Sequence, residues 1–314
     1  MNRRQFIRLL ALETVALSVT RPSSLLSSET APQVAITIDD PNTYKTPIMS
    51  PQERNRAILN ALHGHSDLKS ALFVCGERVD NNVGKKILET WDKAGHLLGN
   101  HSYSHINLDS RQIDPETYVQ DIQRGEEVVK SFSRFTRLFR FPFLKEGDTK
   151  PKRDEVRAFL KEHGYRIGHV TIDTSDWYVD ERMRKRLAKE PDADLTGYRD
   201  FYLSHIRERA TYYDDLSKRV LGRSVKHTLL LHHSLLNALF LGDLLECFER
   251  NGWELIDAQE AFADPVFARL PDIVPAGESI IWALAKESGK FESSLRYPGE
   301  DGGYEEEKMD RLGL

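Results

Sequence analysis

Cysteine, cationic excess and long apolar runs are all scarce in this sequence. Only two cysteines occur in 314 residues, Cys75 in a strand-like run and Cys247 in a helix-like run. We expect two buried free thiols rather than a disulfide, so cysteine usage does not identify the compartment. Lysine and arginine total 44 against 49 aspartate and glutamate residues, for a formal net charge of −5. This balance gives no reason to expect a nucleic-acid partner.

The apolar runs are too short to cross a membrane. The main candidate, residues 7–19, falls below the ~20 helical residues that a bilayer requires, so we expect no transmembrane segment. It follows Arg3 and Arg4, and this arrangement resembles a twin-arginine export signal, although Glu13 interrupts the run. The alternative is a basic amphipathic helix. We predict an export signal and linker over residues 1–31, and a periplasmic or extracellular protein.

From residue 34 onward, short apolar runs alternate with segments of helical periodicity. This alternation is typical of βα units around a mainly parallel sheet. Helices are expected at residues 51–63, 83–94 and 114–131. The candidate strands are residues 34–38, 71–75, 96–98, 138–141, 166–172, 228–231 and 253–256. Seven βα units predict an α/β fold built as a barrel.

Two stretches exceed this regular pattern. Residues 178–226 are highly charged and helix-prone, so they either overhang a site or form a solvated pair of helices. Residues 264–314 contain proline, glycine and charge throughout, with one amphipathic piece at residues 280–285 and no strand pattern. We expect this last part to be an extended tail packed on the barrel. The barrel domain itself is expected to span residues 32–263.

Two histidines and two aspartates predict a metal site. His101 and His105 are four residues apart in GNHSYSHINL, and Asp39 and Asp40 end the apolar run VAITIDDP. A polar surface pair is the alternative for the histidines, and a turn for the aspartates. Side chains of neighbouring strand residues point to opposite faces, so one aspartate can bind a metal while the other serves as a base. A catalytic divalent metal needs about three protein ligands, and Asp40, His101 and His105 supply them.

Three further motifs follow in order, mostly at strand ends. They are LFRFPF with Arg140, TIDTSDW with Asp173, Asp176 and Trp177, and TLLLHHS with His232 and His233. Over roughly residues 34–262, the ordered set resembles the polysaccharide deacetylase family, carbohydrate esterase family 4. The resemblance implies an incomplete (β/α) barrel with about seven parallel strands. It also implies metal-dependent hydrolysis of acetyl groups, chiefly N-acetyl and alternatively O-acetyl, on a carbohydrate.

The resemblance assigns an acid and a base. Asp39 matches the general base, and Arg140 matches the arginine that pairs with it, which we expect to hold the base in place and to depress its pKa. His232 matches the general acid, and Asp176 the carboxylate that tethers it. His233 is the alternative acid, although we interpret it as a structural polar residue. The metal is expected to be zinc, with cobalt, manganese or nickel as alternatives.

The resemblance also implies how the acetyl group is held. Trp177 and Leu230 match apolar walls around the acetyl methyl group, and Phe143 offers a backbone amide to the developing oxyanion, where the family commonly has tyrosine. The expected partner is an acetylated glycan, such as one related to peptidoglycan or chitin. Two alternatives remain: an amidohydrolase acting on a small non-sugar amide, and a carbohydrate-binding protein without catalysis.

Overall fold

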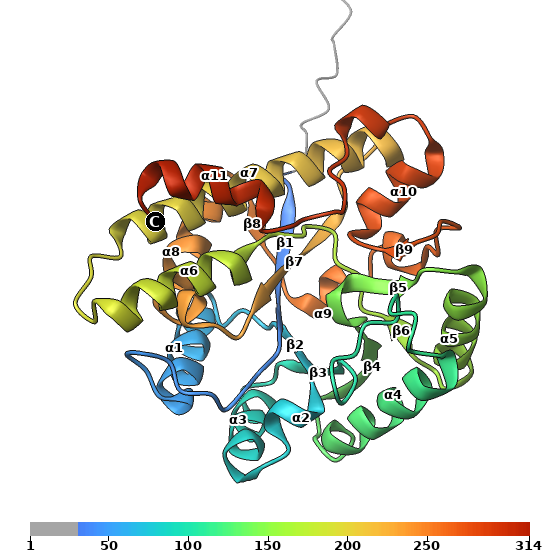
Figure 1. Ribbon diagram of the computed structural model, residues 1–314, viewed down its shortest axis with the longest axis horizontal. Helices are drawn as coiled ribbons and strands as arrows, with labels where there is room; N and C mark the ends of the chain where they lie inside the picture. The colour runs from blue at the N-terminus through green and yellow to red at the C-terminus, as the bar shows by residue number, and fades with distance from the viewer. Residues whose placement is uncertain (1–30) are drawn as a thin grey trace, which may run out of the picture. The chain divides into compact units, whose positions relative to one another are not determined.

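The computed structural model describes residues 31–314, and its strands form a curled parallel sheet (Figure 1). β1 (Gln33–Asp39) is hydrogen bonded to β2 (Ala71–Val74) on one side and to β7 (Lys226–His232) on the other. Beyond β2 the order continues through β3 (Leu97–Asn100), β4 (Phe135–Phe139) and β6 (Arg166–Ile167), and β8 (Glu254–Leu255) pairs with the start of β1. All these pairings are parallel, as βα units require.

The sheet closes only in part. Ile172, which follows β6, forms an isolated parallel bridge with Leu229 of β7. Across this seam Thr228 is the main link, since its carbonyl oxygen accepts from the backbone N–H groups of Thr171 and Ile172. The fold is therefore an incomplete (β/α) barrel, which confirms the predicted fold class.

Helices surround the sheet (Figure 1). They are α1 (Pro51–Gly64), α2 (Gly76–Val79), α3 (Asn82–Lys93), α4 (Pro115–Val129), α5 (Lys150–Glu162), α6 (Asp176–Lys189), α7 (Thr196–Leu221), α8 (Leu235–Arg250), α9 (Ala258–Ala261), α10 (Ile280–Ser288) and α11 (Gly303–Leu312). The sequence sets several of their starts: Ser50 and Glu53 form a capping box on α1, and Asp114 caps α4. The three expected helices are α1, α3 and α4, and each begins and ends within two residues of its predicted bounds. Among residues 31–314, no helix combines the length and apolar character of a membrane span.

Strands covered on both faces explain the near-continuous apolar runs. Residues 34–36 of β1 are completely buried, and Ile58 and Leu62 of α1 are equally buried against the same core. Fully burying one such side chain stabilises the fold by about 1.5–3 kcal/mol. The cysteines are both free, but only Cys75 is buried, whereas Cys247 is half-buried, so the expectation of two buried thiols is wrong for the second.

All seven candidate strands have a counterpart in the sheet, but a second small sheet was not expected. β5 (Lys145–Gly147) and β9 (Ala276–Gly277) pair in antiparallel fashion. These strands are too short to show the alternation of apolar and polar residues by which a strand is recognised in a sequence. Gly277 has φ 122°, and a Cβ there would lie 1.9 Å from the carbonyl oxygen of Leu144, so only glycine fits. The tail therefore contains a strand, contrary to expectation.

The two long stretches are mostly helical. Residues 178–226 form most of α6 and all of α7, and α7 packs against α8 and α10. In the C-terminal part, α10 and α11 are ordered helices rather than an extended tail. The predicted export signal falls outside the described residues.

Candidate active site

A cavity of about 600 Å³ lies at the carboxyl ends of the strands, where (β/α) barrels carry their sites. Eight of the ten site residues predicted from the sequence line it: Asp39, Asp40, His101, His105, Phe143, Trp177, Leu230 and His232. The other two, Arg140 and Asp176, are buried behind them, and each bonds to one of the eight. The chain thus brings all ten side chains together.

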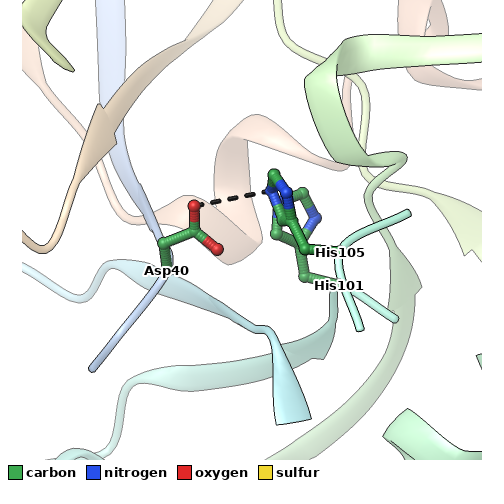
Figure 2. A group of neighbouring side chains, drawn as sticks. All are labelled: Asp40, His101 and His105. Carbon is green, nitrogen blue, oxygen red and sulfur yellow. Dashed lines mark ion pairs between the residues drawn. The ribbon is translucent and has the colours of Figure 1, made fainter. Parts of the chain in front are cut away.

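Asp40, His101 and His105 form a group that could hold a metal ion. Their ligand atoms all lie within 4.8 Å of one another, and Figure 2 shows the carboxylate facing the two imidazoles. Asp40 Oδ2 is 3.5 Å from His105 Nε2. Asp40 directly follows β1 with φ 61°, and His105 has φ 54° in the loop after β3. Such left-handed positions are rare for residues other than glycine and cluster at functional sites.

The protonation of these groups suits a divalent cation. His101 Nδ1–H donates to the carbonyl oxygen of Arg140 at 2.8 Å, which leaves Nε2 free to ligate. Burial lowers the pKa of His101 and of His105, so both imidazoles are neutral. Within residues 31–314, Asp40 Oδ1 is buried without a hydrogen-bond partner. Two neutral imidazoles and a carboxylate with an unsatisfied oxygen fit the ligand set of zinc-like ions.

Arg78 is a member of the site that no sequence motif indicated. It lies in α2, directly after β2, and its Nη1 is 2.5 Å from Asp40 Oδ2. Burial alone would raise the pKa of Asp40, but nearby cations, Arg78 among them, outweigh it and lower this pKa. In the sequence, only the position of Arg78 just beyond the carboxyl end of a barrel strand could have indicated that it belongs to the site.

Asp39 and Arg140 form a buried pair beside the metal-ligand group. Arg140 Nη1 donates to Asp39 Oδ1 at 2.6 Å and to Thr37 Oγ1 at 2.9 Å, while its Nε donates to the carbonyl oxygen of Gly168. The guanidinium is therefore fixed in place. Burial raises the pKa of Asp39 to about 6 even though Arg140 lowers it. The expected depression of this pKa is thus wrong, because desolvation outweighs the guanidinium.

His232 is held by Asp176 at the end of β7. Its Nδ1 is 2.7 Å from Asp176 Oδ1, and its backbone N–H donates to Asp176 Oδ2 at 2.9 Å. Asn237 of α8 donates to the same Oδ2 at 2.8 Å, a contact that the sequence did not reveal. Burial alone would lower the pKa of His232, but Asp176, Asp40 and Asp39 outweigh it and raise this pKa to about 9. The imidazole is therefore a cation at neutral pH.

His233 has a different environment although it is the next residue. Its Nδ1 accepts a hydrogen bond from Arg54 Nε at 3.4 Å, and its Nε2 lies 3.2 Å from Asn55 Oδ1. Burial, with the Arg54 charge, lowers the pKa of His233 to about 3. This neutral ring links the end of β7 to α1, in keeping with a structural role.

Apolar and aromatic groups form the cavity walls beside the ligands. Phe143 has φ 57°, and its ring centroid lies 4.6 Å from that of His105. The Phe143 and Trp177 side chains are 56% and 41% exposed, which is unusual for aromatics and leaves them open to a ligand. Leu230 of β7 is buried at the base.

The two stretches beyond the regular barrel contribute unequally to the cavity. α6 supplies Trp177, Asp180, Glu181 and Arg184 to its lining, and residues 298–301 supply a further wall. No lining residue comes from α7, among the residues that the structure describes. Of the two interpretations of residues 178–226, the overhang applies only to α6, which lines the cavity as far as Arg184, while α7 packs against the body of the barrel.

Comparisons with known proteins match part of the sequence and the fold. The sequence profile of the polysaccharide deacetylase family matches residues 27–168. A peptidoglycan-N-acetylglucosamine deacetylase of Bacillus cereus is 29% identical over 151 residues, which span 46% of this chain and 46% of that protein. The match thus covers less than half of that relative.

Solved structures share the fold. A chitin deacetylase from Colletotrichum lindemuthianum has a TM-score of 0.51 at 18% identity, over 75% of this chain and 90% of its own. A CE4 family pseudoenzyme from Bacillus anthracis also has a TM-score of 0.51 at 18% identity, over 74% of this chain and 65% of its own. These structures show the fold that the chain shares with them, and the family profile and the Bacillus cereus relative match part of its sequence, in agreement with the predicted resemblance to the polysaccharide deacetylase family, carbohydrate esterase family 4.

Proposed function

We propose that this protein is a metal-dependent deacetylase that hydrolyses N-acetyl groups of a carbohydrate, giving acetate and a free amine. One observation carries the proposal. A carboxyl group with a pKa of about 6, Asp39, and an imidazolium with a pKa of about 9, His232, face one cavity beside the Asp-His-His group. Amide hydrolysis needs both a base and an acid, and these two environments separate the roles.

Asp40, His101 and His105 would hold the cation, for which we propose zinc. Once bound, a divalent cation supplies Lewis acidity and an activated water molecule. Asp39 would take the proton from the attacking water, and the fixed Arg140 guanidinium keeps its carboxylate oriented. The positive charge of a bound cation would also favour the ionised form of Asp39, which is the form that a base requires.

His232 would protonate the leaving nitrogen. Its raised pKa keeps the proton available at neutral pH, and the bond to Asp176 fixes which ring nitrogen faces the cavity, since Nδ1 is engaged. Leu230 and Trp177 would receive the acetyl methyl group, and the Phe143 backbone N–H would stabilise the oxyanion. All the residues that this reaction requires line the cavity, apart from Arg140 and Asp176, which are buried behind it.

A glycan substrate is supported by the relatives, one named for peptidoglycan N-acetylglucosamine and one for chitin. An exported protein would meet such glycans, so we retain the proposal of a periplasmic or extracellular location. A small non-sugar amide is the second candidate. It is favoured by the walls that α6 and residues 298–301 place along the cavity, which restrict the length of chain that fits.

Acetate release tests the proposal. The zinc-loaded protein is given N-acetylglucosamine oligomers of increasing length, peptidoglycan fragments and a small aryl acetamide, beside Asp39→Asn and His232→Ala variants. Glu181→Gln, which removes a charge from the same cavity, is the matched control. Release from sugars by the parent and the control alone supports the proposal. Release from the aryl acetamide only would favour the second candidate, and no release would leave a non-catalytic binding protein.

A further inference from the structure

The cavity contains a second charged cluster, apart from the residues with proposed catalytic roles. Asp173, Glu278 and Glu300 all line the cavity, and they come from three separate segments. Asp173 follows β6 in the chain, Glu278 directly follows β9, and Glu300 lies in the loop before α11. Two of the three therefore belong to the C-terminal segment.

The two glutamates already have cationic partners. Lys145 Nζ pairs with Glu278, and Arg209 of α7 pairs with Glu300. Arg296 Nη1 lies 2.9 Å from Glu300 Oε2. Both carboxylates are largely shielded from solvent, since the Glu300 side chain is 1% exposed and the Glu278 side chain is 14% exposed. Such pairing is the usual condition for a buried carboxylate.

Asp173 has no such partner. It is 6% exposed, its Oδ1 accepts the backbone N–H of Thr174 at 2.9 Å, and no ion pair reaches it from residues 31–314. Burial, with the nearby Glu300 and Glu278, raises the pKa of Asp173 well above its usual range. When this carboxyl group is ionised, no neighbouring cation in the described part of the chain forms an ion pair with it.

The numbers of cationic and acidic side chains in the whole cluster also differ by one. Arg296 also binds Glu305 at 2.9 Å, and the His205 ring near Glu305 is neutral because burial lowers its pKa to about 4. The cations are Lys145, Arg209 and Arg296, and the acids are Asp173, Glu278, Glu300 and Glu305. With all four acids ionised, the cluster is one cation short.

On the basis of the function proposed above, we propose that the Asp173 corner of the cavity binds the primary ammonium group of an amino sugar next to the acetylated residue. An ammonium ion brings the missing charge and three hydrogen-bond donors. A cationic side chain at position 299 could not supply this charge without a clash, because a Cβ on Gly299 would lie 2.3 Å from Glu278 Oε2. On binding, Asp173 releases its proton to solvent and pairs with the ammonium.

The substrate class that follows is a partially deacetylated glycan rather than a fully acetylated one. Asp173 would select it, because an N-acetyl group in the same corner brings no charge and leaves the carboxyl unpaired. A hydroxyl group would likewise bring donors without charge. The proposal therefore predicts a preference between substrates that differ by a single acetyl group.

The test compares the fully acetylated N-acetylglucosamine disaccharide with the two disaccharides that carry one free amine. The readout is the ratio of kcat/KM for the preferred amine-bearing disaccharide to that for the fully acetylated one. We expect a ratio of about ten or more for the zinc-loaded parent protein, as for a desolvated charge pair. Asp173→Asn, which keeps the shape of the side chain, should bring the ratio to about one.

Asp301→Asn is the matched control, since Asp301 lines the same cavity but is exposed. It should keep most of the preference. A parent ratio of one or below, or a preference that survives Asp173→Asn, would overturn the proposal.

A binding measurement separates this proposal from the proposed function. Calorimetry with glucosamine and with N-acetylglucosamine requires no turnover. Glucosamine binding that is lost in Asp173→Asn supports the ammonium site even if no substrate releases acetate. Equal binding of glucosamine by the parent and the variant would locate the amine elsewhere, and no binding of glucosamine would count against the site even if the deacetylase is active.

Discussion

Two adjacent histidines in this protein differ in charge because of their neighbours, since His232 is a cation at neutral pH and His233 is neutral. His232 bonds to the Asp176 carboxylate and has a pKa of about 9, whereas His233 faces the Arg54 guanidinium and has a pKa of about 3. The His233 ring is buried and the His232 side chain is 24% exposed, but burial lowers the pKa of both, so their charged neighbours account for the contrast. The sequence LHHS cannot reveal this contrast, because Asp176 and Arg54 are far away along the chain.

The Asp176→Asn variant should shift the alkaline limb of the activity profile. Without the carboxylate, the pKa of His232 falls from about 9, so the acid loses its proton at lower pH. We expect kcat for acetate release to decline from a lower pH than in the parent, and to fall by about a hundredfold at pH 8. Asp180→Asn, on the same face of α6 but bonded to α8, is the control. An unchanged alkaline limb would remove Asp176 from this role.

The His101→Asn variant should lose metal affinity while keeping the fold. The asparagine amide can still donate to the Arg140 carbonyl oxygen, but nothing replaces Nε2 as a ligand. Loss of one of the three proposed ligands should raise the Kd for zinc at least about a hundredfold in a chelator competition assay. His96→Asn, a buried histidine at the opposite end of β3, should bind zinc like the parent. A Kd within threefold of the parent would rule out His101 as a ligand.

At the scale of elements, the junction of α6, α7 and α8 supports the acid side of the site. The Tyr202 hydroxyl of α7 donates to Asn237 Oδ1 at 2.5 Å, and Asn237 Nδ2 donates to Asp176. α7 thus reaches Asp176 through this buried chain of hydrogen bonds, and its Arg209 pairs with Glu300 of the cavity wall.

Tyr202→Phe should therefore destabilise the protein. It leaves the buried Asn237 oxygen without a donor, which costs about 1–3 kcal/mol in the free energy of unfolding and lowers Tm by several degrees. The matched control is Tyr198→Phe, one turn earlier on α7, whose hydroxyl makes no hydrogen bond among the described residues. Thermal unfolding followed by circular dichroism checks both. Equal Tm values for the two variants would contradict this chain of contacts.

Local patterns predicted the elements that hold the groups with proposed catalytic roles. The strands are apolar on both faces and end at polar residues, so Asp39 and His232 could be placed at the carboxyl ends of β1 and β7. Short antiparallel strands such as β5 and β9 left no periodic signal. Partners of the site residues, including Arg78 and Asn237, depend on how helices dock against the barrel, and a single sequence does not reveal that docking.

For the molecule as a whole, the sequence predicted the barrel but not the charge balance inside its cavity. The balance depends on Glu278 and Glu300, which lie in the C-terminal segment that was expected to be an extended tail. Their cationic partners come from other segments, such as Lys145 of β5 and Arg209 of α7. Long-range pairing of this kind appears only once the chain is folded.

The stability of the whole fold should depend on pH through its buried neutral histidines. His96 accepts a hydrogen bond from the Ser70 N–H at 3.0 Å, and burial lowers its pKa to about 4. The unfolded chain, with an ordinary pKa near 6.5, binds a proton that the folded protein does not. This contribution to stability is therefore complete above pH 6.5 and is lost as the pH falls toward 4.

The His96→Asn variant isolates this contribution, because asparagine can still accept the Ser70 hydrogen bond. Relative to the variant, the parent should lose up to roughly 3 kcal/mol in the free energy of unfolding between pH 7 and pH 4. Urea unfolding at several pH values measures the difference. Above pH 7 the two curves should run parallel, which serves as the internal control. Parallel curves down to pH 4 would show that His96 takes up its proton in the folded protein, with the ring accommodated as a cation between Ser70 and Trp91.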